Sequence, residues 1–311
     1  MIVLEQMASS VINLGIAMAT PLALASLGEV YSERAGMINL GIEGIMLMGA
    51  FLGFHFTYVT GNLLVGYLMG IAVGLALGLL LAFMTVTLRV NQVIAGMGIY
   101  FFGFGLSDFL YKTLYGKEYV TIHKSIQIPI PGLSGIPVLG EGLFRQYPMV
   151  YLSYVLIPLM WYLLYNSRWG LWLRSVGENP KAADTMGVNV FRVKYLALML
   201  GSSLAGLAGA FLCLGITGVF FENLTFGMGF IAIGLVYFGK WDPLRAWAGT
   251  LIFGFTWSIS TTLQEFFIKA GYPGMTYFLL MLPYIAVIVA LIAVSRGARA
   301  PKFLGIPYSR E

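Results

Sequence analysis

Long apolar segments recur along the whole chain and limit what it can fold into. A helix needs about 20 mostly apolar residues to cross the roughly 30 Å hydrocarbon layer of a bilayer. About nine segments satisfy this requirement, although the seventh is short: residues 9–29, 36–59, 63–88, 92–111, 149–165, 195–216, 226–239, 246–265 and 275–294. The sequence therefore predicts an all-α membrane protein, with residues 1–311 forming one polytopic helical bundle of about nine transmembrane helices.

The composition excludes a water-soluble enzyme. Hydrophobic residues make up 59% of the chain and charged residues only 10%, whereas soluble domains carry about 25% charged residues. A net charge of +5 would suggest a nucleic-acid partner in a soluble protein. Here the Lys and Arg residues lie in short connections between apolar segments, so the excess indicates orientation in the bilayer instead.

Basic residues set the expected orientation. Segment 166–194 and the tail after residue 294 are both rich in Lys and Arg, and such segments stay in the cytoplasm. Nine spans then place the N-terminus outside, the C-terminus inside and a long external loop at 112–148. The polar break at 31–35 is compatible with either a cytoplasmic turn or a re-entrant break.

Small residues are spaced for close helix packing. Gly66, Gly70, Gly74 and Gly78 recur at intervals of four, which forms a smooth stripe along one helix face. Gly201, Ala205 and Gly209 form a shorter stripe. Both stripes predict contact with a neighbouring helix rather than a pore lining.

Several catalytic patterns are missing or weak. The chain has no phosphate-binding loop ending in Gly-Lys-Ser or Gly-Lys-Thr, so a partner must handle any ATP. Two isolated histidines and one cysteine do not provide the spacing of a metal site. Gly132 to Gly135 has the form of an intramembrane serine protease motif, with Ser134 as nucleophile and His55 or His123 as base. Its position among prolines in an external loop argues against that chemistry.

The cytoplasmic segment 166–194 is predicted to contain a short helix. Asn179 can cap it, Pro180 suits its first turn, and Gly187 can end it. From the residues alone, this helix is either a knob that docks into another protein or a solvated basic loop.

Three sequence strings resemble one known family. They are Glu33–Gly44, Arg174–Gly187, and Gly229–Gly234 with Trp241–Leu244. The chain resembles the permease subunits of bacterial ABC importers for branched-chain amino acids, ribose-like sugars and nucleosides. The likeness is strongest to permeases for nucleosides or simple sugars. In that family the cytoplasmic segment couples the permease to its ATP-binding subunit. The resemblance gives this role to Arg174, Gly177, Glu178, Asn179, Pro180, Ala182, Ala183, Asp184 and Gly187.

The resemblance also implies the partners and the location. We expect an ATP-binding subunit that uses ATP and magnesium, a second homologous permease and an extracellular substrate-binding lipoprotein, all at the bacterial inner membrane. The chain itself is expected to bind no cofactor and to have no ATPase site. Many relatives carry an additional N-terminal helix, and this chain begins at what would be their second helix. A shortened chain of this kind resembles one member of unequal permease pairs, which favours a heterodimer.

Polar residues inside the spans are the candidates for the translocation pathway, because such groups are costly in lipid and usually face a bundle interior or water. These candidates are Asn39, Glu43, Asn91, Gln92, Asp108, Thr261 and Gln264. Glu222 and Glu265 are candidates for contact with the binding protein. Helix caps and interhelical hydrogen bonds are the structural alternatives for several of them.

Two other functions stay open from the sequence. One is a branched-chain amino acid permease, and the other is a transporter driven by an ion gradient. The second would need a buried carboxylate that binds a proton or sodium, and Glu43 is the only deep candidate that the sequence suggests.

Overall fold

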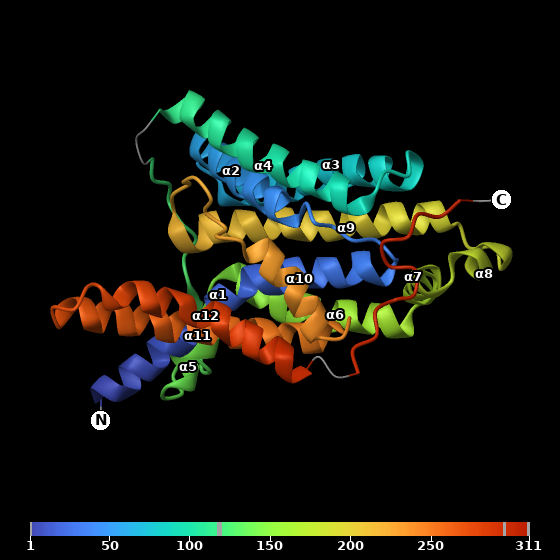
Figure 1. The fold of residues 1–311 in the computed structure, drawn as a ribbon. Helices are drawn as coiled ribbons and strands as arrows, with labels where there is room; N and C mark the ends of the chain where they lie inside the picture. Colours follow the sequence, from blue (N-terminus) through green and yellow to red (C-terminus); the bar gives the residue numbers. More distant parts are fainter. Residues whose placement is uncertain (1, 117–119, 295–296, 310–311) are drawn as a thin grey trace.

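The computed structural model describes residues 2–116, 120–294 and 297–309. Helices account for most of these residues, and Figure 1 shows their arrangement. The long helices are α1 (Ile2–Arg34), α2 (Ile42–Thr60), α3 (Leu63–Ala82), α4 (Gln92–Tyr115), α6 (Pro148–Asn166), α9 (Val190–Phe211), α11 (Pro243–Lys269) and α12 (Met275–Val294). The shorter ones are α5 (Leu139–Phe144), α7 (Arg168–Glu178), α8 (Pro180–Thr185) and α10 (Met228–Phe238), together with the π-helical turns η1 (Phe83–Thr87) and η2 (Leu212–Thr217). Strands β1 (Ile128–Pro129) and β2 (Arg145–Gln146) pair antiparallel.

Every predicted apolar segment contains a helix, but not every helix is long enough to span a bilayer. Seven helices in the described residues are long and apolar enough to cross a membrane. Helix α10 has only 11 residues, and α11, with 27 residues, falls outside that set. The all-helical membrane fold is therefore confirmed, whereas the count of nine spans stays a prediction.

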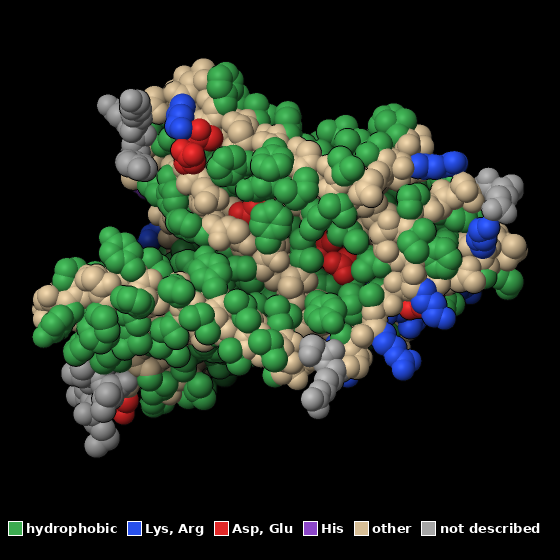
Figure 2. Space-filling view, viewed as in Figure 1, with side chains coloured by type: hydrophobic (Ala, Val, Ile, Leu, Met, Phe, Trp, Pro, Cys, Tyr) green, Lys and Arg blue, Asp and Glu red, His purple; other side chains and the backbone are tan. Residues whose placement is uncertain are grey.

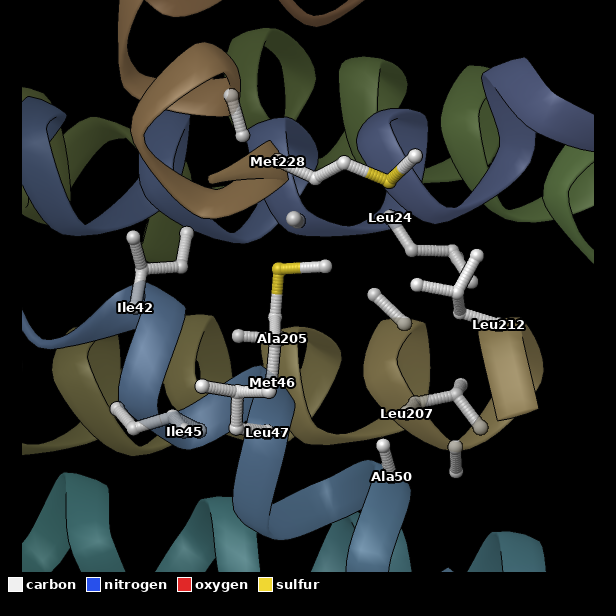
Figure 3. Close-up of a cluster of buried hydrophobic side chains, with 14 of the residues drawn as sticks. Leu24, Ile42, Ile45, Met46, Leu47, Ala50, Ala205, Leu207, Leu212 and Met228 are labelled. Carbon is white, nitrogen blue, oxygen red and sulfur yellow. The ribbon is translucent and has the colours of Figure 1, made fainter. Parts of the chain in front are cut away.

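Helix α9 lies at the centre of the bundle. It packs against α1, α2 and α3, and α11 and α12 pack together beside α1. Figure 3 shows Leu24 of α1, Met46 of α2, Leu207 of α9 and Met228 of α10 in the buried cluster between these helices. Because α1, α2 and α9 are buried on most sides, they form the frame that positions the polar residues described below.

The glycine stripes allow the close approach of α3 and α9. A Cβ atom at Gly74 would lie 2.2 Å from the carbonyl oxygen of Ser202, and one at Gly70 would lie 2.6 Å from the Cβ of Ala210. On another face of α9, a Cβ atom at Gly209 would lie 1.8 Å from the carbonyl oxygen of Met46. The prediction that both stripes serve helix packing is confirmed.

The break after the first helix differs from the expected one. Helix α1 continues through Tyr31 and Arg34, so the break begins at Ala35, and α2 begins at Ile42 rather than at residue 36. Gly36 adopts φ +80°, a backbone conformation that favours glycine. Figure 1 shows the connection running back along the bundle before α2 begins. We call residues 35–41 the α1–α2 turn.

Basic residues concentrate at one end of the bundle. Figure 2 shows most of the visible Lys and Arg side chains near the end where α7, α8 and the C-terminus lie. We call this the basic end. Lys117, Arg296 and Arg310, which the sequence places in the external loop and the tail, lie outside the described residues. At the opposite end, the predicted loop 112–148 contains the last residues of α4, the short helix α5 and the β1–β2 pair.

Candidate functional site

A buried carboxylate joins the N-terminus of α10 to the N-terminus of α2. Glu43 is 1% exposed, and its side chain accepts hydrogen bonds from the Thr225 hydroxyl and from the backbone N–H groups of Gly227 (2.8 Å) and Gly229 (2.6 Å). These N–H groups belong to the start of α10, where no intrahelical acceptor exists and the helix dipole is positive. Glu43 therefore accepts hydrogen bonds from the otherwise unpaired N–H groups at the start of a short helix inside the bundle, and we call this contact between α2 and α10 the Glu43 junction.

The backbone around α10 is shaped for this contact. Gly227 adopts φ +78° just before the helix begins. A Cβ atom at Gly229 would lie 2.7 Å from both the backbone nitrogen and the Cα of Glu43. Only glycine at position 229 permits the two helix starts to approach this closely.

Asn39 belongs to a second buried polar group next to the first. Its backbone N–H donates to the Glu29 carboxylate (2.9 Å), and its side-chain amide donates to the Ser202 hydroxyl (3.3 Å). Asn39 is fully buried and Glu29 is 1% exposed. Glu29 Oε2 and Asn39 Oδ1 have no hydrogen-bond partner among the described residues. Glu33, one helical turn after Glu29, accepts a hydrogen bond from the Trp241 indole N–H.

The sequence-based expectation that Glu43 is the only deep carboxylate is therefore wrong. Glu29 and Glu33 are also buried, at 1% and 5% exposure. Their spacing of four residues on α1 was a signal that both share one helix face. Their burial could not be inferred because it depends on α9, α10 and Trp241, which are distant in sequence. In Figure 2, acidic side chains are visible between apolar ones at mid-length of the face that α10 crosses.

Asn91 and Gln92 hold the start of α4. Asn91 is exposed and caps the helix by accepting from the N–H groups of Val93 (2.9 Å) and Ile94 (3.3 Å). Gln92 is 2% exposed, and its Oε1 accepts from the N–H of Ile38 in the α1–α2 turn (2.8 Å). The local contacts of both residues are structural, and their place on a pathway stays a prediction.

The remaining acidic and polar candidates lie toward the end opposite the basic end. Lys112 contacts both Asp108 (2.6 Å) and Glu222 (3.1 Å), which joins α4 to the loop before α10. On α11, Thr261 and Glu265 line a groove of about 570 Å³ between this helix and the start of α1. Gln264, next to Glu265 in sequence, donates to the hydroxyl of Ser260 at 3.0 Å. The structure therefore brings Glu222 close to Asp108 through their shared contact with Lys112.

The predicted cytoplasmic helix exists as α8. Asn179 accepts a hydrogen bond from the Ala182 N–H (3.1 Å), Pro180 begins the helix, and Gly187 follows it with φ +83°. These observations confirm the predicted cap, first turn and helix end. Glu178, Asn179, Ala182 and Gly187 are exposed, whereas Gly177, Pro180 and Ala183 are buried against the protein. Before α8, Arg174 in α7 lies over the Tyr165 ring, 5.2 Å from the ring centroid.

A family model for the permease component of branched-chain amino acid transport systems matches residues 11–294. The chain belongs to this permease family. Its function is therefore that of a transport subunit rather than an enzyme.

The residues of the protease-like motif make ordinary structural contacts. Ser134 lies in a surface turn, where its N–H donates to the Ile130 carbonyl (3.0 Å). His55 is hydrogen-bonded to the Tyr115 hydroxyl (2.8 Å).

Named relatives match this permease over most of its length. It is 35% identical to the guanosine ABC transporter permease protein NupQ of Bacillus subtilis, over 97% of each chain. It is 35% identical to the nucleoside ABC transporter permease protein NupC of Lactococcus lactis, over 94% of each chain. It is 43% identical to a Haloferax volcanii protein named "Putative glucose ABC transporter permease protein TsgC13", over 79% of this chain and 75% of that protein. No solved structure gives a significant match.

Proposed function

We propose that this permease forms the translocation pathway for nucleosides in an ATP-binding cassette importer of the bacterial inner membrane. The observation that carries the proposal is the similarity to NupQ and NupC over at least 94% of each chain, since both are named for nucleosides. A glucose importer is the second candidate, because the protein named for glucose is 43% identical over a shorter region.

We propose the orientation from the charge distribution. With the basic end in the cytoplasm, α7 and α8 lie inside the cell, and the long loop 112–148 lies outside, as the positive-inside rule requires. We propose nine spans in one transmembrane domain, in which α10 contributes a half-length helix that starts within the bundle at Glu43. Short or broken helices of this kind line the pathway in many transporters.

The Glu43 junction suits a pathway for an uncharged, hydroxyl-rich molecule. Both oxygens of the carboxylate accept hydrogen bonds from the start of α10 and the preceding loop, so the group serves this contact rather than binding of a charged substrate. A nucleoside needs hydrogen-bonding groups that adapt to its hydroxyls and amino groups, and tight recognition belongs to the external binding protein.

Segment Arg174–Gly187 is proposed to transmit the ATP-driven movement of the ATP-binding subunit to the permease. Helix α8 presents Lys181 and Ala182 to solvent at the basic end, and Met186, directly after the helix, is 83% exposed. A short exposed helix with a fixed cap is a suitable knob for a groove in the ATP-binding subunit. That subunit would hold the ATP and magnesium.

A second, homologous permease is the proposed partner within the membrane. Bacillus subtilis has two guanosine ABC transporter permeases, NupQ and NupP, which match this chain at 35% and 28% identity. This pairing favours a heterodimer. Glu222 and Glu265, at the outer end, are proposed to contact a substrate-binding lipoprotein.

The test is transport by the whole importer. The permease, its copurified partners and the binding protein are reconstituted in liposomes, and uptake of labelled guanosine and labelled glucose is measured with and without internal ATP. We expect ATP-dependent guanosine uptake that excess adenosine inhibits and excess glucose does not. Uptake of glucose alone would establish the second candidate. Uptake that needs an ion gradient and no ATP would overturn the ABC mechanism for this chain.

A further inference from the structure

The C-terminal tail, residues 297–309, crosses the basic end and contacts two separate parts of the permease. Figure 1 shows it passing between the region of α7 and α8 and the end of α1. Its residues lack the apolar periodicity of a helix, and they form turns rather than regular structure. What holds the tail is a set of specific contacts.

The first contacts are to segment Arg174–Gly187, which we call the coupling segment. The N–H of Phe303 donates to the carbonyl of Gly177 (3.0 Å), and the hydroxyl of Tyr308 donates to the Asp184 carboxylate (2.9 Å). Tyr308 is 9% exposed, and its ring lies 5.8 Å from the ring of Phe191, centroid to centroid. The tail is therefore fixed at both the end of α7 and the end of α8.

The second contacts are to the α1–α2 turn. The N–H of Gly305 donates to the carbonyl of Gly36 (3.1 Å). A Cβ atom at Gly305 would lie 3.1 Å from the Cδ1 of Ile38, so the tail backbone packs directly on this turn. Ile38 is followed by Asn39, and the turn leads into α2 at the Glu43 junction.

Two hydrogen bonds connect the coupling segment and the α1–α2 turn through tail residues that are two positions apart. Phe303 bonds to Gly177, and Gly305, two residues later, bonds to Gly36. Gly177 itself lies against α1, because a Cβ atom there would be 2.1 Å from the Arg34 carbonyl oxygen. A displacement of α8 would therefore move the tail, and the tail would move the turn that precedes Glu43.

We infer that the tail is a positioning element, which transmits movement of the coupling segment to the α1–α2 turn, with Tyr308 as its positioning residue. The inference rests on the proposed role of Arg174–Gly187. Tyr308 contacts neither the substrate nor the ATP-binding subunit in this scheme. It acts by holding Asp184, and with it the C-terminal end of α8.

The experiment compares variants in the reconstituted importer. Tyr308→Phe removes the hydroxyl and keeps the ring against Phe191. Asp184→Asn keeps an acceptor oxygen and removes its charge. Ser309→Ala, at the exposed neighbouring position, is the matched control. Copurification of the partners verifies assembly, and the readout is guanosine taken up per ATP hydrolysed.

We expect Tyr308→Phe to assemble normally and to lower uptake per ATP about tenfold, since a hydrogen bond to a charged group contributes on this scale. Asp184→Asn should lower it less, the double variant should equal Tyr308→Phe alone, and Ser309→Ala should match the wild type. A merely structural role would reduce assembly and leave the ratio unchanged.

Two results separate failure of this inference from failure of the proposed function. If the wild type couples ATP to uptake and Tyr308→Phe does so equally well, the tail has no transmitting role. If Tyr308→Phe does not assemble, an unchanged ratio in Asp184→Asn would overturn the inference instead. If the wild type itself transports without ATP, the proposed function fails, and the inference fails with it.

Discussion

Replacing Glu43 with glutamine tests whether the junction of α2 and α10 depends on a carboxylate. One carboxylate oxygen accepts from the Thr225 hydroxyl and the Gly227 N–H, and the other accepts from the Gly229 N–H. Glutamine keeps one acceptor oxygen, and its nitrogen only donates. One orientation of the new amide leaves the Gly229 N–H unpaired, and the other leaves both Thr225 and Gly227 without this acceptor.

The expected cost follows from these contacts. A buried donor without a partner costs about 1–3 kcal/mol, and removing a negative charge from a helix N-terminus costs up to about 2 kcal/mol. We expect Glu43→Gln to destabilise the permease by about 2–4 kcal/mol on these two terms. Glu43→Ala removes every acceptor and should cost more. Thr225→Val, the control, leaves both backbone donors paired and should cost about 1 kcal/mol.

The assay is thermal unfolding of the purified permease in mild detergent, followed by uptake kinetics of each variant that assembles. A change of 1 kcal/mol shifts the unfolding midpoint by about 2–4 °C for chains of 150–250 residues, so a cost of about 2–4 kcal/mol for Glu43→Gln should lower it by about 4–16 °C. Thr225→Val should lower it by about 2–4 °C. The reasoning is refuted if Glu43→Gln unfolds at the wild-type temperature, or if Thr225→Val is as harmful as Glu43→Ala.

Three further predictions follow from exposed and tightly packed positions. Lys181→Glu, on the exposed face of α8, should leave the permease folded and lower uptake per ATP hydrolysed; normal uptake would contradict the coupling role. Gly206→Leu should prevent folding, because a Cβ atom there would lie 2.1 Å from a backbone oxygen of α3, and the folded peak should be lost on size-exclusion chromatography. Gly98→Ala is the control and should match the wild type, because a Cβ atom there would have no neighbour within 4 Å. Equal yields would count against this packing. Lys112→Ala should leave the unfolding temperature unchanged, because exposed ion pairs contribute about 0–1 kcal/mol. If Glu222 contacts the binding protein, the same variant should alter the salt dependence of uptake.

Local sequence signals predicted the long helices and the short helix α8 well. The apolar segments located each long helix because lipid requires a continuous hydrophobic surface and internally paired backbone groups. The cap at Asn179 and the stop at Gly187 were predictable because both depend on residues within one turn of α8. The stripe from Gly66 to Gly78 predicted a close neighbour, although not which helix it would be.

Contacts between distant segments were not predictable in the same way. Glu29 lies at the end of an apolar segment, and nothing near it in sequence shows that α9 covers it or that Asn39 donates to it. Gln92 begins a helix, and only the fold shows that it accepts from Ile38, 54 residues earlier. The tail contains no periodic pattern, so its hydrogen bonds to Gly177 and Gly36 depend on where the bundle places those residues.

The interruptions in the backbone limit how the permease can change conformation. Backbone N–H groups at membrane depth must be paired within the protein, since lipid offers no acceptor. In the α1–α2 turn and at the start of α10 this pairing comes from the side chains of Glu29, Gln92 and Glu43. Breaking one of these bonds during transport would leave a buried donor unpaired, at a cost of about 1–3 kcal/mol each. The lowest-energy movement therefore keeps the turn, α2 and α10 together as one body with the end of α1 and the start of α4, which supply Glu29 and Gln92. It places the conformational change at helix contacts made only by apolar side chains, which can slide without losing hydrogen bonds.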